Sequence, residues 1–192
     1  MKLDTIEAVK KYIIKAGISD KSQKPVIEVL NGGVSCTVWK IVLKDNRWVM
    51  KQALEKLKVN ADWFSDIERI HREHEVMDVL YALVPKGAIP EVLHVDYVNH
   101  IYMMSCAEEE VKTWKDILMN GNFNVSYAKN AAALLRKIHE CSNSINDEDK
   151  AKFQDQKYFI QVVGDACTHY QSHEHLRRRK ISNSFHPISL FL

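Results

Sequence analysis

The stretch over residues 26–53 constrains the fold most, because two turns divide it into three runs rich in β-branched and aromatic side chains. The first run enters the pair Gly32-Gly33, and the third run carries Lys51. Glycine favours tight turns, whereas Val, Ile, Thr and Trp favour strands. The pattern therefore predicts three consecutive antiparallel strands, over 26–30, 36–43 and 47–52.

The glycine turn and the lysine also indicate a chemistry. Without a Cβ at Gly32 and Gly33, backbone N–H groups can approach an anionic oxygen closely. The period of two in the third strand puts Val49, Lys51 and Ala53 on one face, so Lys51 would face a nucleotide phosphate lying under the turn. Two glycines between strands are more often only a turn, and a turn without any ligand is the alternative interpretation.

Length and composition narrow the class of protein. The chain has 192 residues, of which 46% are hydrophobic, and a formal charge of +2. This length suffices for one domain or for a small lobe with part of a second, and so small a charge argues against nucleic acid as a partner. No apolar run approaches the ~20 residues of a membrane span, and no signal peptide is evident. We therefore expect a cytoplasmic protein with no membrane partner and with reduced cysteines.

Two helices are predicted in the N-terminal half. Apolar spacing predicts a lead-in helix over 4–16 that stops at Gly17, and a long helix over 60–83 with one apolar stripe. Glu73 lies on or beside that stripe, where an unpaired carboxylate is costly. We expect Lys51 to be its partner; alternatively, Glu73 lies at the edge of the stripe and reaches water.

Two further strands, over 92–97 and 101–105, complete a five-stranded sheet. Beyond an acidic linker that starts at residue 108, the pattern predicts helices over 113–119 and 125–141, an acidic turn at 147–149 and a helix to about residue 163. The expected fold class is α+β. Its four segments are a helical lead-in (1–24), a sheet with its long helix (25–107), a linker with the first helices of a helical lobe (108–163), and an unassigned tail (164–192).

Six short runs stand in the order found in a protein-kinase-like N-lobe and hinge. They are Asn31-Gly-Gly-Val-Ser35, Val49-Met-Lys-Gln-Ala53, Arg69-Ile-His-Arg-Glu73, Ile89-Pro-Glu-Val-Leu-His94, Met103-Met-Ser105 and Thr113-Trp-Lys-Asp-Ile-Leu118. Over about residues 25–141, the chain resembles the aminoglycoside phosphotransferase and methylthioribose-kinase-like superfamily. The resemblance implies a protein-kinase-like fold, ATP as cofactor, and transfer of the γ-phosphate to a hydroxyl of a small molecule whose identity is unknown.

The resemblance also implies roles for individual residues. The turn residues would cover the ATP phosphates, Lys51 would hold the α- and β-phosphates, and Glu73 would fix Lys51 by an ion pair. Val49 would pack on the adenine, and hinge residues would meet the adenine edge through backbone groups. The turn residues are Gly32, Gly33, Val34 and Ser35, and the hinge residues are Met104, Ser105 and Ala107.

One departure from the family pattern concerns catalysis. Relatives carry the catalytic base and the Mg²⁺ ligands in an H-G-D-x-x-x-x-N loop and a later Asp of the second lobe. The nearest string here has Val163 in place of the histidine and Tyr170 in place of the asparagine, and it resembles instead the segment that relatives carry well before their catalytic loop. No catalytic residue or metal ligand is therefore assigned, and we expect a C-lobe truncated before the catalytic loop and no phosphoryl transfer by this chain alone. The alternatives are a non-catalytic nucleotide-binding or regulatory remnant, and a plain interaction module.

The helix expected over 125–141 has an apolar side rich in Ala, Leu and Ile. In relatives such a helix packs in the middle of a larger helical lobe. Here we expect that side to be covered by self-association or a partner chain, or the C-terminal third to be loosely ordered.

Other residues are weaker candidates for a site. His71, His74 and Glu75 suggest a zinc hydrolase, but an HExxH motif that starts at His74 needs a histidine where Asp78 stands. Three histidines between residues 169 and 175 lack a completing carboxylate or cysteine, and the basic run 177–180 is typical of a solvated tail. Cys36 follows the glycine turn without a His/Asp arrangement, so we expect it to pack.

Overall fold

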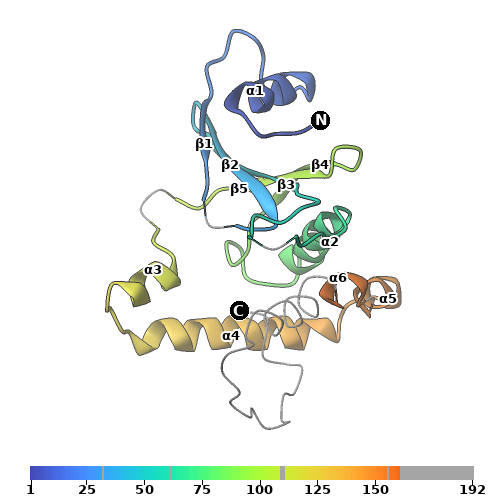
Figure 1. Cartoon of the computed structure of the whole chain (residues 1–192). Helices are drawn as coiled ribbons and strands as arrows, with labels where there is room; N and C mark the ends of the chain where they lie inside the picture. The colour runs from blue at the N-terminus through green and yellow to red at the C-terminus, as the bar shows by residue number, and fades with distance from the viewer. Residues whose placement is uncertain (32, 61, 109–110, 155, 161–192) are drawn as a thin grey trace.

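The computed structural model describes residues 1–31, 33–60, 62–108, 111–154 and 156–160. Its centre is an open five-stranded antiparallel sheet in the order β1-β2-β3-β5-β4 (Figure 1). The strands are β1 (Val26–Val29), β2 (Cys36–Leu43), β3 (Asn46–Ala53), β4 (Val92–Asp96) and β5 (Ile101–Ser105). The expected α+β class and the antiparallel sheet are confirmed, and each predicted strand end lies within one residue of the observed end.

Helices lie on both sides of the sheet and beyond it. In Figure 1, α1 lies on one side of the sheet and α2 on the other, while α4 is the long helix on the far side of α2. The helices are α1 (Ile6–Lys15), α2 (Arg69–Tyr81), α3 (Trp114–Met119), α4 (Val125–Ser142), α5 (Asp147–Gln154) and α6 (Lys157–Phe159).

The two faces of the sheet belong to separate clusters of buried side chains. Met50 and Met103 pack in the cluster that includes α1. Ala53 and Tyr102 pack in the cluster that includes α2. Lys51 is paired directly with Tyr102 across β3 and β5, so both side chains lie on the α2 face. The period of two read from the third strand is thereby confirmed.

Helix α1 begins two residues after the predicted start and ends one residue before the predicted end, ahead of Gly17. The Thr5 side chain accepts a hydrogen bond from the Ala8 N–H, which caps the first turn. Gly17 has a φ of +71°, the left-handed conformation in which glycine commonly ends a helix. In the body of the helix, the Tyr12 hydroxyl donates to the Asp96 carboxylate at 3.1 Å and ties α1 to β4.

Helix α2 begins later than the sequence predicts. The apolar spacing predicted a helix over 60–83, but α2 comprises Arg69–Tyr81. The residues before it fold back on the segment after β3 instead, and the Leu57 N–H donates to the Trp63 carbonyl at 3.0 Å. This pairing is incompatible with a helix over the same residues, so the prediction was wrong for residue 60 and residues 62–68, while residue 61 lies outside the described residues.

The helices after the sheet agree with prediction in part. Thr113 and Asn124 cap α3 and α4 with their side chains, and both helices begin within one residue of the predicted position. The acidic run at 147–149 was predicted as a turn, but it forms the first turn of α5, where negative charge is favourable. The helix predicted to reach residue 163 is interrupted between α5 and α6. Its last residues and the tail over 164–192 lie outside the described residues.

Little of α4 and its approach is buried. Cys141 is the one buried residue among those of α4, while Leu135 and Ile138 on its apolar side are half-buried. Phe123, just before the helix, is 83% exposed. The expectation of a poorly covered apolar side therefore agrees with the exposure along this helix. Among the residues that the structure describes, none of the helices combines the length and the hydrophobicity that crossing a bilayer requires.

Candidate functional site

The predicted ion pair between Lys51 and Glu73 is present. The Lys51 ammonium donates to Glu73 Oε1, which brings β3 and α2 together on the α2 face of the sheet. The Lys51 side chain is 18% exposed and that of Glu73 is 43% exposed. The pair therefore lies at the surface of the sheet–helix interface, where another charged group can reach it. Glu73 thus pairs with Lys51 as expected, and its exposure shows that it also reaches water, as the alternative expected.

The ring of a buried tyrosine, Tyr102, lies close to the Lys51 ammonium. The Tyr102 ring is fully buried, and Lys51 Nζ lies 5.6 Å from its centroid. Burial, and then the nearby negative charge of Glu73, raise the pKa of the Tyr102 phenol, so the phenol stays neutral. A neutral aromatic face under an ammonium group favours the charged lysine and limits its movement.

The glycine turn lies between β1 and β2, and Gly32 falls outside the described residues. The Val34 carbonyl accepts the Lys58 N–H at 2.8 Å, and the Ser35 carbonyl accepts the Leu54 N–H at 3.0 Å. Within the described part of the chain, the N–H groups of residues 33–35 donate no hydrogen bond to protein. These donors are therefore available to an anionic ligand.

Nothing inside the described structure requires glycine at position 33. Its φ lies outside the left-handed region, and a Cβ would meet the Cys36 carbonyl oxygen at 3.8 Å and Val38 Cγ2 at 3.9 Å, which are ordinary contacts. A ligand that approaches the backbone closely would supply the missing reason.

The residues predicted to contact adenine are less open than the turn. Val49 is only 8% exposed and so offers little surface for packing on a ring. It pairs with Met104, which is half-buried. The Ser105 N–H donates to the Glu91 carbonyl at 2.9 Å, and the exposed Ala107 follows two residues later. The structure thus places all three hinge residues in one run at the end of β5, on the strand next to Lys51.

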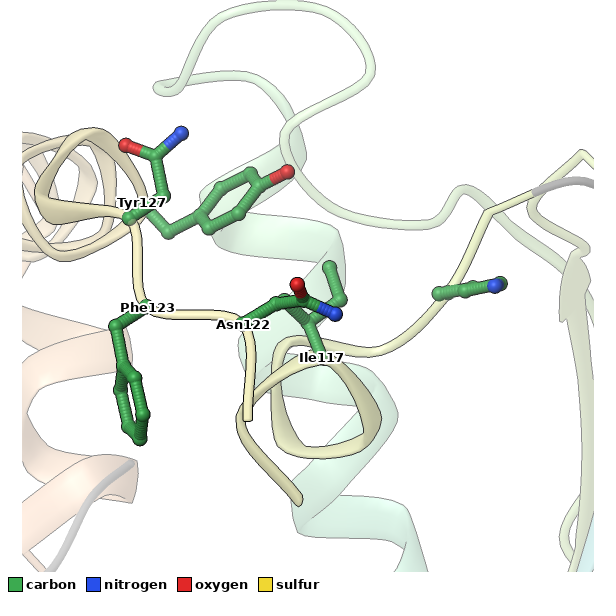
Figure 2. Close-up of a pocket in the computed structure, with 6 residues that line it drawn as sticks. Ile117, Asn122, Phe123 and Tyr127 are labelled. Carbon is green, nitrogen blue, oxygen red and sulfur yellow. The ribbon is translucent and has the colours of Figure 1, made fainter. Parts of the chain in front are cut away.

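Two hollows in the described surface lie away from these residues. Figure 2 shows one between α3 and the start of α4, with Ile117, Asn122, Phe123 and Tyr127 around it. A second hollow lies against α1, beside Ile13. None of the residues predicted to contact ATP lines either of them. The chemistry of the Lys51–Glu73 pair and of the free N–H donors, rather than the depth of a hollow, identifies the candidate site.

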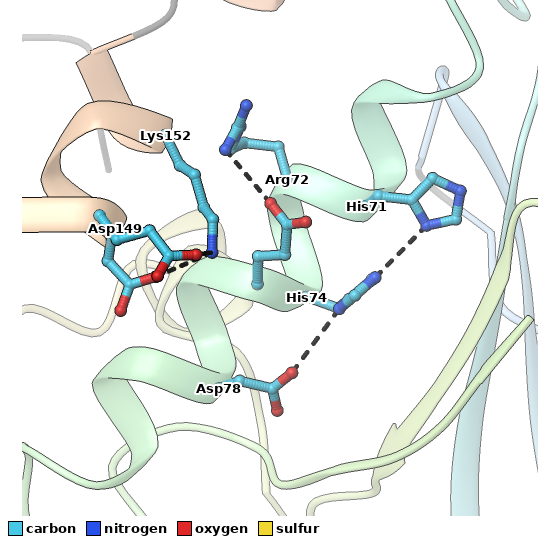
Figure 3. Close-up of polar contacts among 8 residues, drawn as sticks. His71, Arg72, His74, Asp78, Asp149 and Lys152 are labelled. Atoms are coloured by element: carbon cyan, nitrogen blue, oxygen red, sulfur yellow. Dashed lines mark hydrogen bonds and ion pairs between the residues drawn. The ribbon is translucent and has the colours of Figure 1, made fainter. Parts of the chain in front are cut away.

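Sequence reasoning weighed His71 and His74 only as part of a zinc motif and missed the cluster that they form with His100. His71 Nδ1 lies 3.3 Å from His74 Nε2, and His71 Nε2 lies 3.1 Å from His100 Nδ1. Figure 3 shows the first contact and its continuation to Asp78. Burial, and then His100 and His74, lower the pKa of His71. The spacing of His71 and His74 on one helix was visible in the sequence, but His100 comes from the turn between β4 and β5.

Metal and nucleophile chemistry find no support in the described residues. No group of three or more His, Cys, Asp or Glu side chains there is arranged to hold a metal ion. Cys36 is buried with Ala53, Ile70 and Tyr102, so its predicted packing role is confirmed. The histidines at 169–175, the basic run 177–180 and the string from Val163 to Tyr170 lie outside the described residues.

Arg69 is the other residue that sequence reasoning missed. It belongs to one of the six runs but received no role. Its guanidinium donates to four backbone carbonyls, two of which belong to the end of the glycine turn and to the end of β3. A bond to a carbonyl depends on no partner side chain, so no sequence pattern pointed to it.

Neither a comparison with protein-family models nor one with curated proteins finds a match for this chain.

Proposed function

We propose that this chain binds ATP on the α2 face of its sheet as the N-lobe of a small-molecule phosphotransferase. The observation that carries the proposal is the Lys51–Glu73 ion pair beside a turn whose N–H groups at residues 33–35 donate to none of the described residues. Lysine paired with a helix glutamate and a glycine-containing turn are the parts with which kinase-like enzymes hold ATP phosphates. The reaction proposed for the family is transfer of the γ-phosphate to a hydroxyl of a small molecule.

Each residue has one part in this proposal. The N–H groups of residues 33–35 and the Ser35 hydroxyl donate to phosphate oxygens, and Lys51 neutralises their charge. Glu73 keeps the ammonium of Lys51 pointed along the sheet. Ser105 and Ala107 offer backbone groups to the adenine edge, and Val49 adds a small apolar contact. Magnesium would accompany ATP, but the proposal assigns it no ligand among the described residues.

A second candidate is nucleotide binding without phosphoryl transfer. The observation that favours it is that the nearest string in the given sequence to the H-G-D-x-x-x-x-N loop has Val163 for the histidine and Tyr170 for the asparagine. Release of ADP from ATP in the presence of a panel of sugars and aminoglycosides distinguishes the two. Turnover that copurifies with the protein and disappears in Lys51→Ala would reveal a catalytic group within this chain and contradict the expectation of no transfer by this chain alone. Binding without turnover is the expected result and favours the second candidate.

The binding proposal is tested by titration calorimetry with MgATP. Lys51→Ala should weaken binding by about tenfold or more, since a charge-assisted contact to phosphate contributes about 1.5–3 kcal/mol. Lys56→Ala is the matched control, because Lys56 pairs with Asp62 in an exposed loop near the same strand end. It should bind MgATP like the wild-type chain. Absence of binding by the wild-type chain, or equal affinity of a folded Lys51→Ala variant, would contradict the proposal.

A further inference from the structure

Arg69 opens α2, and its guanidinium joins three segments of the chain. Nη2 donates to the carbonyl of Ser35, the last residue of the glycine turn, and at 2.9 Å to the carbonyl of Leu54, which follows β3. Nη1 donates to the carbonyls of Ser65 and Asp66, at 3.2 and 2.7 Å, just before α2. One side chain thus holds the turn, the end of Lys51's strand and the start of Glu73's helix.

Stabilisation of α2 does not explain this arginine. A positive charge in the first turn opposes the helix dipole, and Glu68, the N-cap residue before α2, makes no side-chain cap bond. Burial lowers the pKa of the Arg69 guanidinium, against the favourable charges of Asp66 and Glu73. Both effects are unfavourable, so the bonds to carbonyls of distant segments must offset them.

We propose that Arg69 is a positioning residue that fixes the glycine turn to α2, so that the turn and the Lys51–Glu73 pair present one preformed surface to a nucleotide phosphate. The inference rests on the proposed ATP site. Glu73 lies four residues after Arg69, on the same side of α2. Arg69 contacts the turn and Glu73 contacts Lys51, so one helix sets the position of both phosphate-binding parts. A turn that is already ordered avoids an ordering cost on binding.

The distinguishing test compares ATP with adenosine. A loosened turn should weaken binding of the phosphates but not of the base, whereas general loosening weakens both. We expect Arg69→Lys, measured by calorimetry, to lose about tenfold in MgATP affinity and nothing in adenosine affinity. Arg69→Met should lose more for MgATP. Arg136→Lys, on an exposed arginine of α4, is the charge-conserving control and should bind both ligands like wild type.

Several results would overturn the proposal. A folded Arg69→Lys variant with unchanged MgATP affinity would do so, as would equal losses for MgATP and adenosine. If Arg69→Met does not fold, the affinities of Arg69→Lys, which keeps the positive charge, decide whether the proposal holds. A Lys variant in which the whole sheet loses protection from hydrogen exchange would indicate a general role in stability and would also overturn it.

A measurement without nucleotide separates this inference from the proposed function. The Leu54 N–H and the Lys58 N–H hold the carbonyls of Ser35 and Val34. Amide hydrogen exchange of these two groups should accelerate at least about tenfold in Arg69→Lys, while β5 amides exchange as in wild type. If the wild-type chain binds no ATP, the proposed function fails, and this exchange still decides whether Arg69 fixes the turn. Unchanged exchange at Leu54 would show that it does not.

Discussion

Replacing Gly33 by alanine separates a role in binding from a role in folding. The backbone at Gly33 avoids the left-handed region, and the new Cβ would make only ordinary contacts, at 3.8 and 3.9 Å. At such a position alanine stabilises a fold by about 0.4–1 kcal/mol, because it restricts the unfolded chain. We therefore expect the melting temperature of Gly33→Ala to stay level or to rise slightly.

Binding should change in the opposite direction. In the proposed site the added methyl group occupies space into which a phosphate oxygen approaches the free N–H donors. A loss of one charge-assisted hydrogen bond, about 1.5–3 kcal/mol, corresponds to at least a tenfold rise of the Kd for MgATP. Titration calorimetry and thermal unfolding on the same preparation measure both effects.

Gly87 supplies the matched control. It has a φ of +83° in the connection between α2 and β4, and an added Cβ would meet nothing within 4 Å. Gly87→Ala should lower the free energy of unfolding by about 1–2 kcal/mol, the cost of left-handed backbone for an L-residue, and leave MgATP affinity unchanged. A folded Gly33→Ala variant that binds MgATP like wild type, or one that loses stability like Gly87→Ala, would refute the reasoning.

Three further predictions concern stability and association. Burial holds the pKa of His71 in the folded chain below its value in the unfolded chain, so the stabilising contribution of His71 is complete above the unfolded pKa and is lost as pH falls. Urea unfolding should therefore show a lower free energy of unfolding at about pH 5 than at about pH 7. His71→Gln should reduce this dependence on pH. Ile70 is 1% exposed, so Ile70→Ala should lower the free energy of unfolding, measured with urea, by about 2–4 kcal/mol. Ile14 is 36% exposed, so Ile14→Ala should lower it by about 1 kcal/mol or less. Equal losses in the two variants would contradict the assigned core. The exposed side chains of Met119 and Phe123 should promote self-association, so sedimentation should show a dimer whose fraction rises with protein concentration. Phe123→Ser should lower that fraction. A wild-type chain that stays monomeric at all concentrations would argue against self-association.

Local patterns predicted the elements whose backbone partners lie nearby in the sequence. The alternation around Lys51 predicted its face, and the helical period around Glu73 predicted the face of α2, so their contact followed from two short stretches. The start of α2 did not follow, because Trp63 and Ile67 continue the apolar spacing while the backbone at residues 63–65 pairs with the segment after β3. Tertiary pairing overrides local periodicity in such a segment.

The contacts that were missed join elements far apart in the sequence. Arg69 reaches carbonyls of residues 35 and 54, and His100 reaches His71 from another element. Hydrogen bonds to backbone carbonyls do not depend on the side chain of the accepting residue, so the sequence pattern does not predict them. A histidine in a turn belongs to no periodic pattern from which its position could be predicted. The positions of such groups depend on how the sheet and α2 meet, which the sequence alone does not specify.

Hydrogen exchange with and without MgATP tests the central claim most directly, because it locates the ligand along the chain. The account predicts slower exchange on addition of MgATP at the N–H groups of residues 33–35 and around Lys51, with little change between Lys112 and Tyr127 at the hollow of Figure 2. Slower exchange confined to Lys112–Tyr127, or no change anywhere in residues 26–105 at saturating MgATP, would contradict an ATP site formed by the glycine turn and the Lys51–Glu73 pair.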